Sequence, residues 1–149
     1  MTNGHEHDAG ERYFYGAVPV FLVDDVAAAV EYYRDILGFD IDFVLEEYGR
    51  VARDAAVIDF IRSEPPGRRN SMASAGVEKG SDAVIIVSDI EDIYIEIQEH
   101  GANVIERLAV RAYGVLDCMI EDLNGYRVTI GGDLEEEPDG GRAWTSITC

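Results

Sequence analysis

The sequence contains one pattern twice, with the two copies 64 positions apart (89 − 25). In the first copy, a run of apolar residues ends at Val23-Asp24-Asp25, and a helix-like pattern then leads to Gly38. The second copy ends its apolar run at Val87-Ser88-Asp89, and its helix-like pattern leads to Gly101. Each copy predicts a strand, an acidic helix cap, an amphipathic helix and a glycine stop. Because two copies are too few for a solenoid, the repeat predicts one pseudo-symmetric domain.

The spacing of apolar residues predicts the same order of elements in both halves. We expect one helix over 25–37 and another over 89–100, the second opened by a capping box at Ser88-x-x-Glu91 or, alternatively, capped by Asp89. The predicted strands cover 18–23, 39–46, 50–53 and 56–62 in the first half and 83–87, 103–107, 115–120 and 126–130 in the second. Each half is therefore β-α-β-β-β, and the predicted fold class is α+β with two pseudo-symmetric modules.

Two of these predicted elements carry finer expectations about local structure. Phe39, Ile41, Phe43 and Leu45 alternate mainly with polar residues, which favours a half-buried strand with these four on one face. Asn124-Gly125 is typical of a tight hairpin turn between the last two strands.

Composition suggests how the chain is divided. Residues 1–16 are polar and acidic, which is typical of a flexible tail, and 133–149 form a second acidic tail. Between them, 17–132 are expected to form a single domain of two modules, 17–62 and 82–132. The segment 63–81 is rich in Pro, Gly, Ser and Arg and is predicted to be the linker between the modules.

The charge of the chain limits its partners. Its 12 basic and 30 acidic residues give a net charge of −18, which argues against nucleic acid and anionic membrane as partners. No apolar run approaches the ~20 residues that span a bilayer. Because Cys118 and Cys149 form neither a disulfide framework nor a metal-type spacing, we expect a cytoplasmic protein. The acidity suits either a salt-rich host or a cationic small-molecule ligand.

Several short motifs, taken in order, resemble one known superfamily. They are Val23-x-Asp25, Tyr32-Tyr33, Leu37-Gly38-Phe39, Val87-x-Asp89, Gly101-Ala102 and the run from Asp122 to Val128. Together they resemble the vicinal oxygen chelate superfamily, also called the glyoxalase/bleomycin resistance protein/dioxygenase group, over residues 17–132. The resemblance implies that the paired modules form a curved, incompletely closed barrel around a concave site. It also implies a homodimer.

The resemblance implies four positions from which catalytic members of the superfamily bind a divalent metal. These positions are occupied here by Val18, Asp59, Asp82 and Thr129. Valine cannot bind a metal and threonine is a poor neutral ligand, whereas a divalent site needs three or more good donors. We therefore expect no metal and no cofactor, with a divalent metal as the alternative.

Strand alternation predicts which side chains line the concave site. If one face of each inner strand points into it, the site is an apolar cup that contains two aspartates and one arginine. The candidate ligand-binding residues are Val20, Phe43, Asp59, Asp82, Val84, Arg127 and Thr129. In the alternative, Arg127 pairs with one aspartate for structural reasons and the cup is core. No catalytic residue is assigned.

Three functions agree with these residues. The first is a metal-free, bleomycin-resistance-like protein that sequesters a small molecule, favoured by the acidity and by Phe43, Tyr113 and Trp144. The second is a metal-dependent lyase, isomerase or dioxygenase of the same superfamily, in which Asp59 and Asp82 act as acid and base if burial raises one pKa. The third is a non-catalytic regulatory dimer.

Overall fold

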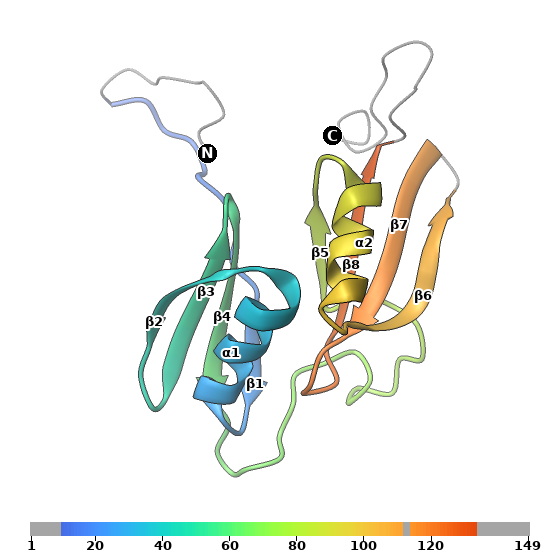
Figure 1. Cartoon of the computed structure of the whole chain (residues 1–149). Coiled ribbons are helices and arrows are strands. Elements are labelled where there is room, and N and C mark those ends of the chain that lie inside the picture. Colours follow the sequence, from blue (N-terminus) through green and yellow to red (C-terminus); the bar gives the residue numbers. More distant parts are fainter. Residues whose placement is uncertain (1–9, 112–113, 134–149) are drawn as a thin grey trace.

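The computed structural model describes residues 10–111 and 114–133 (Figure 1). Within these residues, each half of the chain folds into one helix and four strands in the predicted order. The N-terminal module consists of β1 (Val20–Val23), α1 (Val26–Leu37), β2 (Asp40–Val44), β3 (Tyr48–Arg53) and β4 (Ala56–Arg62). The C-terminal module consists of β5 (Ala83–Ile86), α2 (Ile90–Glu99), β6 (Asn103–Val110), β7 (Val115–Glu121) and β8 (Arg127–Asp133).

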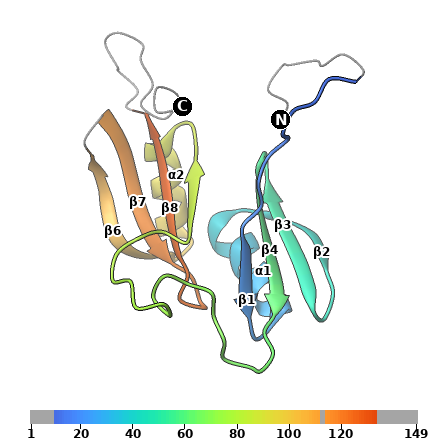
Figure 2. The same ribbon diagram turned by 180° about the vertical axis from the view of Figure 1, so that it is seen from behind.

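Each module contains one four-stranded mixed sheet. The strand orders are β1-β4-β3-β2 and β5-β8-β7-β6, so the two sheets have the same topology. In each sheet the first strand runs parallel to the last, and the other neighbours are antiparallel. The sheets remain separate and do not close into a barrel, as the views from the front and from behind show (Figures 1 and 2). The predicted α+β fold of two βαβββ modules is confirmed.

The first helix begins and ends as the sequence predicts. The Ala28 N–H donates to the Asp25 carboxylate at 3.0 Å, which satisfies one of the free donors at the helix N-terminus. Gly38 ends the helix at a φ of 74°, a conformation that costs glycine little. The apolar stripe of α1 is buried against the sheet and consists of Val26, Ala29, Val30, Tyr33 and Leu37.

The second helix begins differently from its prediction. Asp89 is the N-cap residue, but it has a φ of 53° and its side chain makes no capping hydrogen bond. The predicted capping box of Ser88 and Glu91 is wrong, since the N-cap residue is Asp89, the alternative, and not Ser88. Glu91 and Asp92 instead place negative charge in the first turn, where it suits the helix dipole.

The two modules pack together through the faces that carry their helices. The Phe21 and Tyr126 rings stack with centroids 4.2 Å apart, and the Tyr33 hydroxyl donates to Asp122 at 2.6 Å. Phe21, Tyr33 and Tyr126 all belong to one continuous buried core. Burial raises the pKa of the Asp122 carboxyl, although hydrogen bonds from Tyr33 and from the backbone oppose this.

The linker 63–81 contacts both modules beside β1 and β5, each of which is an edge strand of its sheet. Asn70 accepts from the Leu22 N–H at 3.1 Å and donates to the Val20 carbonyl at 2.9 Å, so it caps the unpaired edge of β1. At the other module, the Met72 N–H donates to Asp82 at 2.7 Å. The linker therefore connects β1 to β5 by side-chain contacts as well as by the chain itself.

The face of each sheet opposite its helix is called the open face below. A bulge in β2 between Ile41 and Phe43 decides which residues reach the open face of the first sheet. Ile41 packs against the core, whereas Phe43 is the cross-strand partner of Arg50 on the open face. The prediction that Phe39, Ile41, Phe43 and Leu45 share one face is wrong because the bulge changes the alternation.

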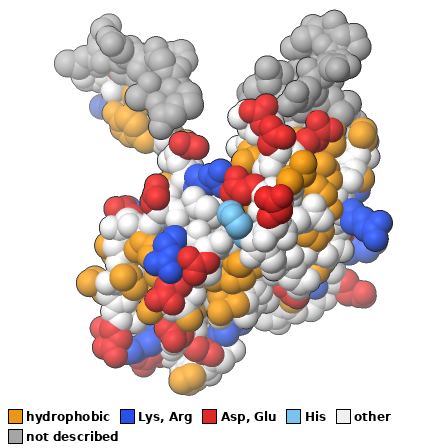
Figure 3. Space-filling view, viewed as in Figure 1, with side chains coloured by type: hydrophobic (Ala, Val, Ile, Leu, Met, Phe, Trp, Pro, Cys, Tyr) orange, Lys and Arg blue, Asp and Glu red, His pale blue; other side chains and the backbone are white. Residues whose placement is uncertain are grey.

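The surface agrees with the acidic composition. Figure 3 shows carboxylate side chains spread over both modules on the face seen in Figure 1. None of the helices in the described residues is long and apolar enough to cross a membrane. Most of the two predicted tails, together with Tyr113 and Trp144, lies outside the described residues, so the tail boundaries stay predictions.

Candidate functional site

One row of side chains crosses the open face of the N-terminal sheet. Strand pairing places Val20 of β1 beside Asp59 of β4, Asp59 beside Arg50 of β3, and Arg50 beside Phe43 of β2. Three of the four were predicted to line the ligand site, and the row brings them together. Arg50 was not predicted.

The centre of this row is an ion pair. Arg50 donates to the Asp59 carboxylate from Nε at 2.7 Å and from Nη2 at 3.0 Å, which is the two-pronged geometry that favours arginine over lysine. The Tyr48 hydroxyl donates to the same carboxylate at 2.5 Å. The Arg50 guanidinium also lies 5.6 Å from the centre of the Phe43 ring. Four side chains from three strands are therefore fixed in one cluster.

The ion pair sets the charge of Asp59. The carboxylate is only 4% exposed, but the Arg50 guanidinium holds its pKa below the usual value. The hydrogen bond to Asp59 raises the pKa of Tyr48 in turn. Asp59 is therefore ionised at neutral pH, because the hydrogen bond from Arg50 outweighs the effect of burial on its pKa. Asp59 thus lacks the raised pKa that the acid-base hypothesis assigns to one of the two aspartates.

An equivalent row crosses the open face of the C-terminal sheet. It joins Val84 of β5 to Thr129 of β8, Met119 of β7 and Glu106 of β6. Thr129 is 7% exposed, and its hydroxyl is hydrogen-bonded to the Ser81 hydroxyl. This row therefore contains two predicted site residues, Val84 and Thr129, but no ion pair between β7 and β8 at the central positions.

Asp82 and Arg127 lie beside the second row and hold the linker in place. The Asp82 carboxylate accepts from the Met72 N–H at 2.7 Å and from the Arg127 N–H at 2.8 Å. The Arg127 guanidinium donates to the Glu78 carbonyl at 2.5 Å. A structural role is thus visible for both residues, although it uses the Arg127 backbone and not the predicted pairing of its side chain with an aspartate.

The structure divides the seven predicted residues into two groups. Val20, Asp59 and Phe43 belong to the N-terminal sheet, and the other four belong to the C-terminal module. Within the described residues, no hydrogen bond or ion pair joins the two groups. A cleft of about 250 Å³ does lie between the modules, and its walls include Val57 from the first and Val84 and Ile86 from the second.

The residues at the four positions implied for a metal are not suited to bind a metal ion. Val18 has no donor atom, and Asp59 already accepts from a cation that would repel the metal. The Asp82 carboxylate is occupied by two backbone N–H groups, and the Thr129 hydroxyl is occupied by Ser81. In the part of the chain that the structure describes, no three His, Cys, Asp or Glu side chains are grouped as a metal site would need.

A family model described as the glyoxalase/bleomycin resistance protein/dioxygenase superfamily matches residues 17–130. The chain belongs to this superfamily. The match includes residues of both modules and the linker between them. No curated protein matches the chain by sequence.

Solved structures of the same fold include a bleomycin-binding protein and a bleomycin resistance determinant. The bleomycin-binding protein from Streptomyces verticillus, complexed with copper(II)-bleomycin, is 23% identical with a TM-score of 0.63, covering 80% of this chain and 97% of its own. The bleomycin resistance determinant encoded on transposon Tn5 is 16% identical, with a TM-score of 0.63 and coverages of 80% and 98%. A glyoxalase-related enzyme from Clostridium phytofermentans is 18% identical, with a TM-score of 0.64 and coverages of 85% and 100%.

Proposed function

We propose that this protein is a bleomycin-resistance-like binding protein that sequesters a small organic molecule on its open faces without a metal. The observation that carries the proposal is the Arg50–Asp59 ion pair, which lies with Tyr48 and Phe43. The exposed apolar side chains of Val20 and Ile61 are cross-strand partners of Asp59 and Tyr48. Mostly apolar surface with a few fixed polar groups is typical of small-molecule sites.

The cluster leaves one donor available to a ligand. The Arg50 side chain is 34% exposed, and within the described residues its Nη1 makes no hydrogen bond. A ligand acceptor could bind there, while an aromatic ring of the ligand could pack beside Phe43 and Val20. The net charge of −18 favours a ligand that is cationic overall.

A homodimer is part of the proposal, since the open faces expose apolar side chains. Val84 is 50% exposed and Ile86 is 58% exposed, and both come from an edge strand. Contiguous exposed apolar side chains of this kind mark interaction surfaces. A second copy that placed its N-terminal open face over the C-terminal open face of the first would complete a cup containing both predicted groups of residues.

The test is calorimetric titration with bleomycin, both metal-free and as its copper(II) complex, with the protein kept in a chelator until mixing. We expect binding of the metal-free compound, weakened about tenfold or more by Arg50→Ala, because a charge-assisted hydrogen bond contributes about 1.5–3 kcal/mol. Arg34→Ala is the matched control, since Arg34 is paired with Asp35 on the exposed side of α1. Equal affinities for wild type, Arg50→Ala and Arg34→Ala would contradict the proposal.

Sedimentation of the same samples, together with the binding and turnover data, distinguishes the regulatory dimer and the metal-dependent enzyme from the sequestering protein. A dimer that binds no compound of this class would favour the regulatory role. Ligand turnover or binding that appears only after a divalent metal is added would favour a metal-dependent enzyme of the superfamily. A dimer that binds metal-free ligand supports the sequestration proposal.

A further inference from the structure

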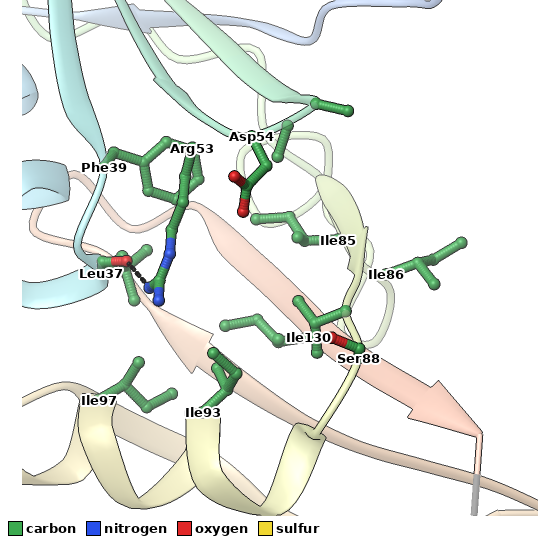
Figure 4. A pocket seen from close by; sticks show the side chains of 13 residues that line it. Leu37, Phe39, Arg53, Asp54, Ile85, Ile86, Ser88, Ile93, Ile97 and Ile130 are labelled. Carbon is green, nitrogen blue, oxygen red and sulfur yellow. Dashed lines mark hydrogen bonds between the residues drawn. The ribbon is translucent and has the colours of Figure 1, made fainter. Parts of the chain in front are cut away.

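A second cavity lies on the side of the modules that carries the helices. Its volume is about 370 Å³, and it lies between the end of α1, the β3–β4 turn, the end of β5 and the first turns of α2 (Figure 4). None of the seven predicted site residues lines it. It is therefore separate from the open-face rows, and a ligand bound in it would not contact the residues of the proposed binding site.

The walls of this cavity are mostly apolar, with Arg53, Asp54 and Ser88 as their polar side chains. Its aliphatic and aromatic lining comes from both modules, as Figure 4 shows, and includes Leu37, Phe39, Ile85, Ile93, Ile97 and Ile130. An apolar cavity holds water poorly, because a water molecule there finds too few hydrogen-bond partners. The volume of this cavity lies within the range of small-molecule pockets, roughly 300–1,000 Å³.

The one cation beside the cavity is already neutralised. Arg53 donates to the Leu37 carbonyl at 2.8 Å and to the Glu96 carboxylate at 2.9 and 3.1 Å. Glu96 is thus paired through both oxygens. An anionic ligand would have to displace this carboxylate before it could reach Arg53.

Asp54 is the remaining charged group of the lining. Within the described residues this exposed side chain makes no hydrogen bond and no ion pair, and it lies next to Arg53. The β3–β4 turn holds it at a φ of 52°, and Figure 4 shows its carboxylate directed toward the space between Phe39 and Ile85. An unpaired carboxylate at the mouth of an apolar cavity favours a cation with an apolar body.

We propose that this cavity binds a compact apolar amine, with the ammonium group at Asp54 and the apolar body among the isoleucines. The acidic surface of the whole chain would raise the local concentration of such a cation. The ligand of this cavity would differ in size from the ligand proposed for the open faces.

The test uses three probes of nearly equal size: 2-phenylethylammonium, 2-phenylethanol and 3-phenylpropanoate. Isoleucine δ1-methyl groups of the full chain are labelled, and their NMR signals are followed during titration. The amine should shift the signals of Ile85, Ile93, Ile97 and Ile130 and leave Ile58 and Ile120, in the sheet cores, unchanged. The alcohol should bind more weakly and the carboxylate more weakly still.

Two variants distinguish the contribution of the Asp54 charge to binding from the contribution of the apolar cavity. Asp54→Asn should weaken amine binding by about tenfold and leave alcohol binding unchanged, since asparagine keeps the shape and tolerates positive φ. Asp42→Asn, at an exposed position on β2, is the matched control and should change neither. Ile93→Phe should fill part of the cavity and weaken the amine and the alcohol together.

Three outcomes would overturn the proposal. They are an amine affinity that Asp54→Asn does not change, tightest binding by the carboxylate, and methyl shifts spread over isoleucines outside the cavity. Should Ile93→Phe unfold the protein, the Asp54→Asn comparison still decides the matter. Arg50→Ala should leave amine binding unchanged, so failure of this site and failure of the open-face proposal are distinguishable.

Discussion

The two modules share one frame and differ on the face that the frame leaves open. In both, a valine of the edge strand begins a cross-strand row, Val20 in the first and Val84 in the second. The next two positions are Asp59 and Arg50 in the N-terminal sheet. Their counterparts in the C-terminal sheet are Thr129 and Met119. The same place is thus charged in one module and neutral in the other.

This difference indicates that the sheet topology does not require an ion pair at these positions. The C-terminal module forms the same four-stranded sheet with a hydroxyl and a thioether where the first has a carboxylate and a guanidinium. A buried ion pair also adds little net stability compared with apolar residues of similar volume. The pair is therefore better explained by recognition than by folding, and exchanging residues between the rows tests this.

The largest expected effect comes from placing a carboxylate alone in the second row. Thr129→Asp should lower the free energy of unfolding by about 3 kcal/mol, because Thr129 is buried and no cation lies at its cross-strand neighbours. Urea unfolding followed by circular dichroism measures this loss. A change below about 1 kcal/mol would mean that the second open face is more hydrated than its burial indicates.

The comparison is sharpened by rebuilding the pair. Met119→Arg, added to Thr129→Asp, should recover a large part of the loss, with a coupling energy of about 1–3 kcal/mol in a double-mutant cycle. The converse change, Asp59→Thr with Arg50→Met, should leave stability within about 1 kcal/mol of wild type and abolish ligand binding. A severe loss of stability in this converse variant would show that the pair serves the fold.

Two buried aspartates, one in each module, should respond oppositely to acid. Arg50 lowers the pKa of Asp59, so this pair stabilises the fold above about pH 4, and the contribution is lost as the pH falls through the lowered pKa. Burial raises the pKa of Asp122, so its ionised form costs stability, and the cost is relieved as the pH falls through the raised pKa. The two slopes have opposite signs.

Unfolding free energies measured between about pH 6 and 3 separate these contributions. Asp59→Asn should make the loss of stability on acidification shallower than in wild type, whereas Asp122→Asn should make it steeper. The slope is the informative quantity, since Asp122→Asn also changes the hydrogen bond from Tyr33. Parallel slopes in the three proteins would mean that neither carboxyl titrates differently in the folded chain.

Much of the fold was predictable, because it depends on spacing. The repeat, the two apolar helix faces and the glycine after α1 predicted the order of the elements, and their boundaries differ from the predicted ones by three residues at most. The Arg50–Asp59 contact was also within reach. The predicted strands 50–53 and 56–62 leave a two-residue connection, and a tight hairpin turn there pairs positions whose numbers sum to 109 (53 + 56). The numbers 50 and 59 give the same sum.

The features that escaped prediction depend on tertiary structure. The bulge before Phe43 adds one residue to β2, and nothing in the local alternation marks it. Asp82 resembles a ligand group in sequence, but it accepts from the Met72 N–H because the linker returns across β5. The Figure 4 cavity unites residues from both modules, and no local pattern reports how two modules pack.

The smallest expected effects concern the two helix caps, which come from equivalent aspartates of the repeat. Asp25→Ala should lower the free energy of unfolding by about 1 kcal/mol, because it removes the acceptor of the Ala28 N–H. Asp89→Gly should raise it by about 0.5 kcal/mol, because Asp89 makes no capping bond and glycine relieves its positive φ. Thermal unfolding of both variants under one buffer condition gives the comparison. Equal losses in the two would mean that Asp89 caps α2 in solution, and that the repeated aspartates still have the same role in both modules.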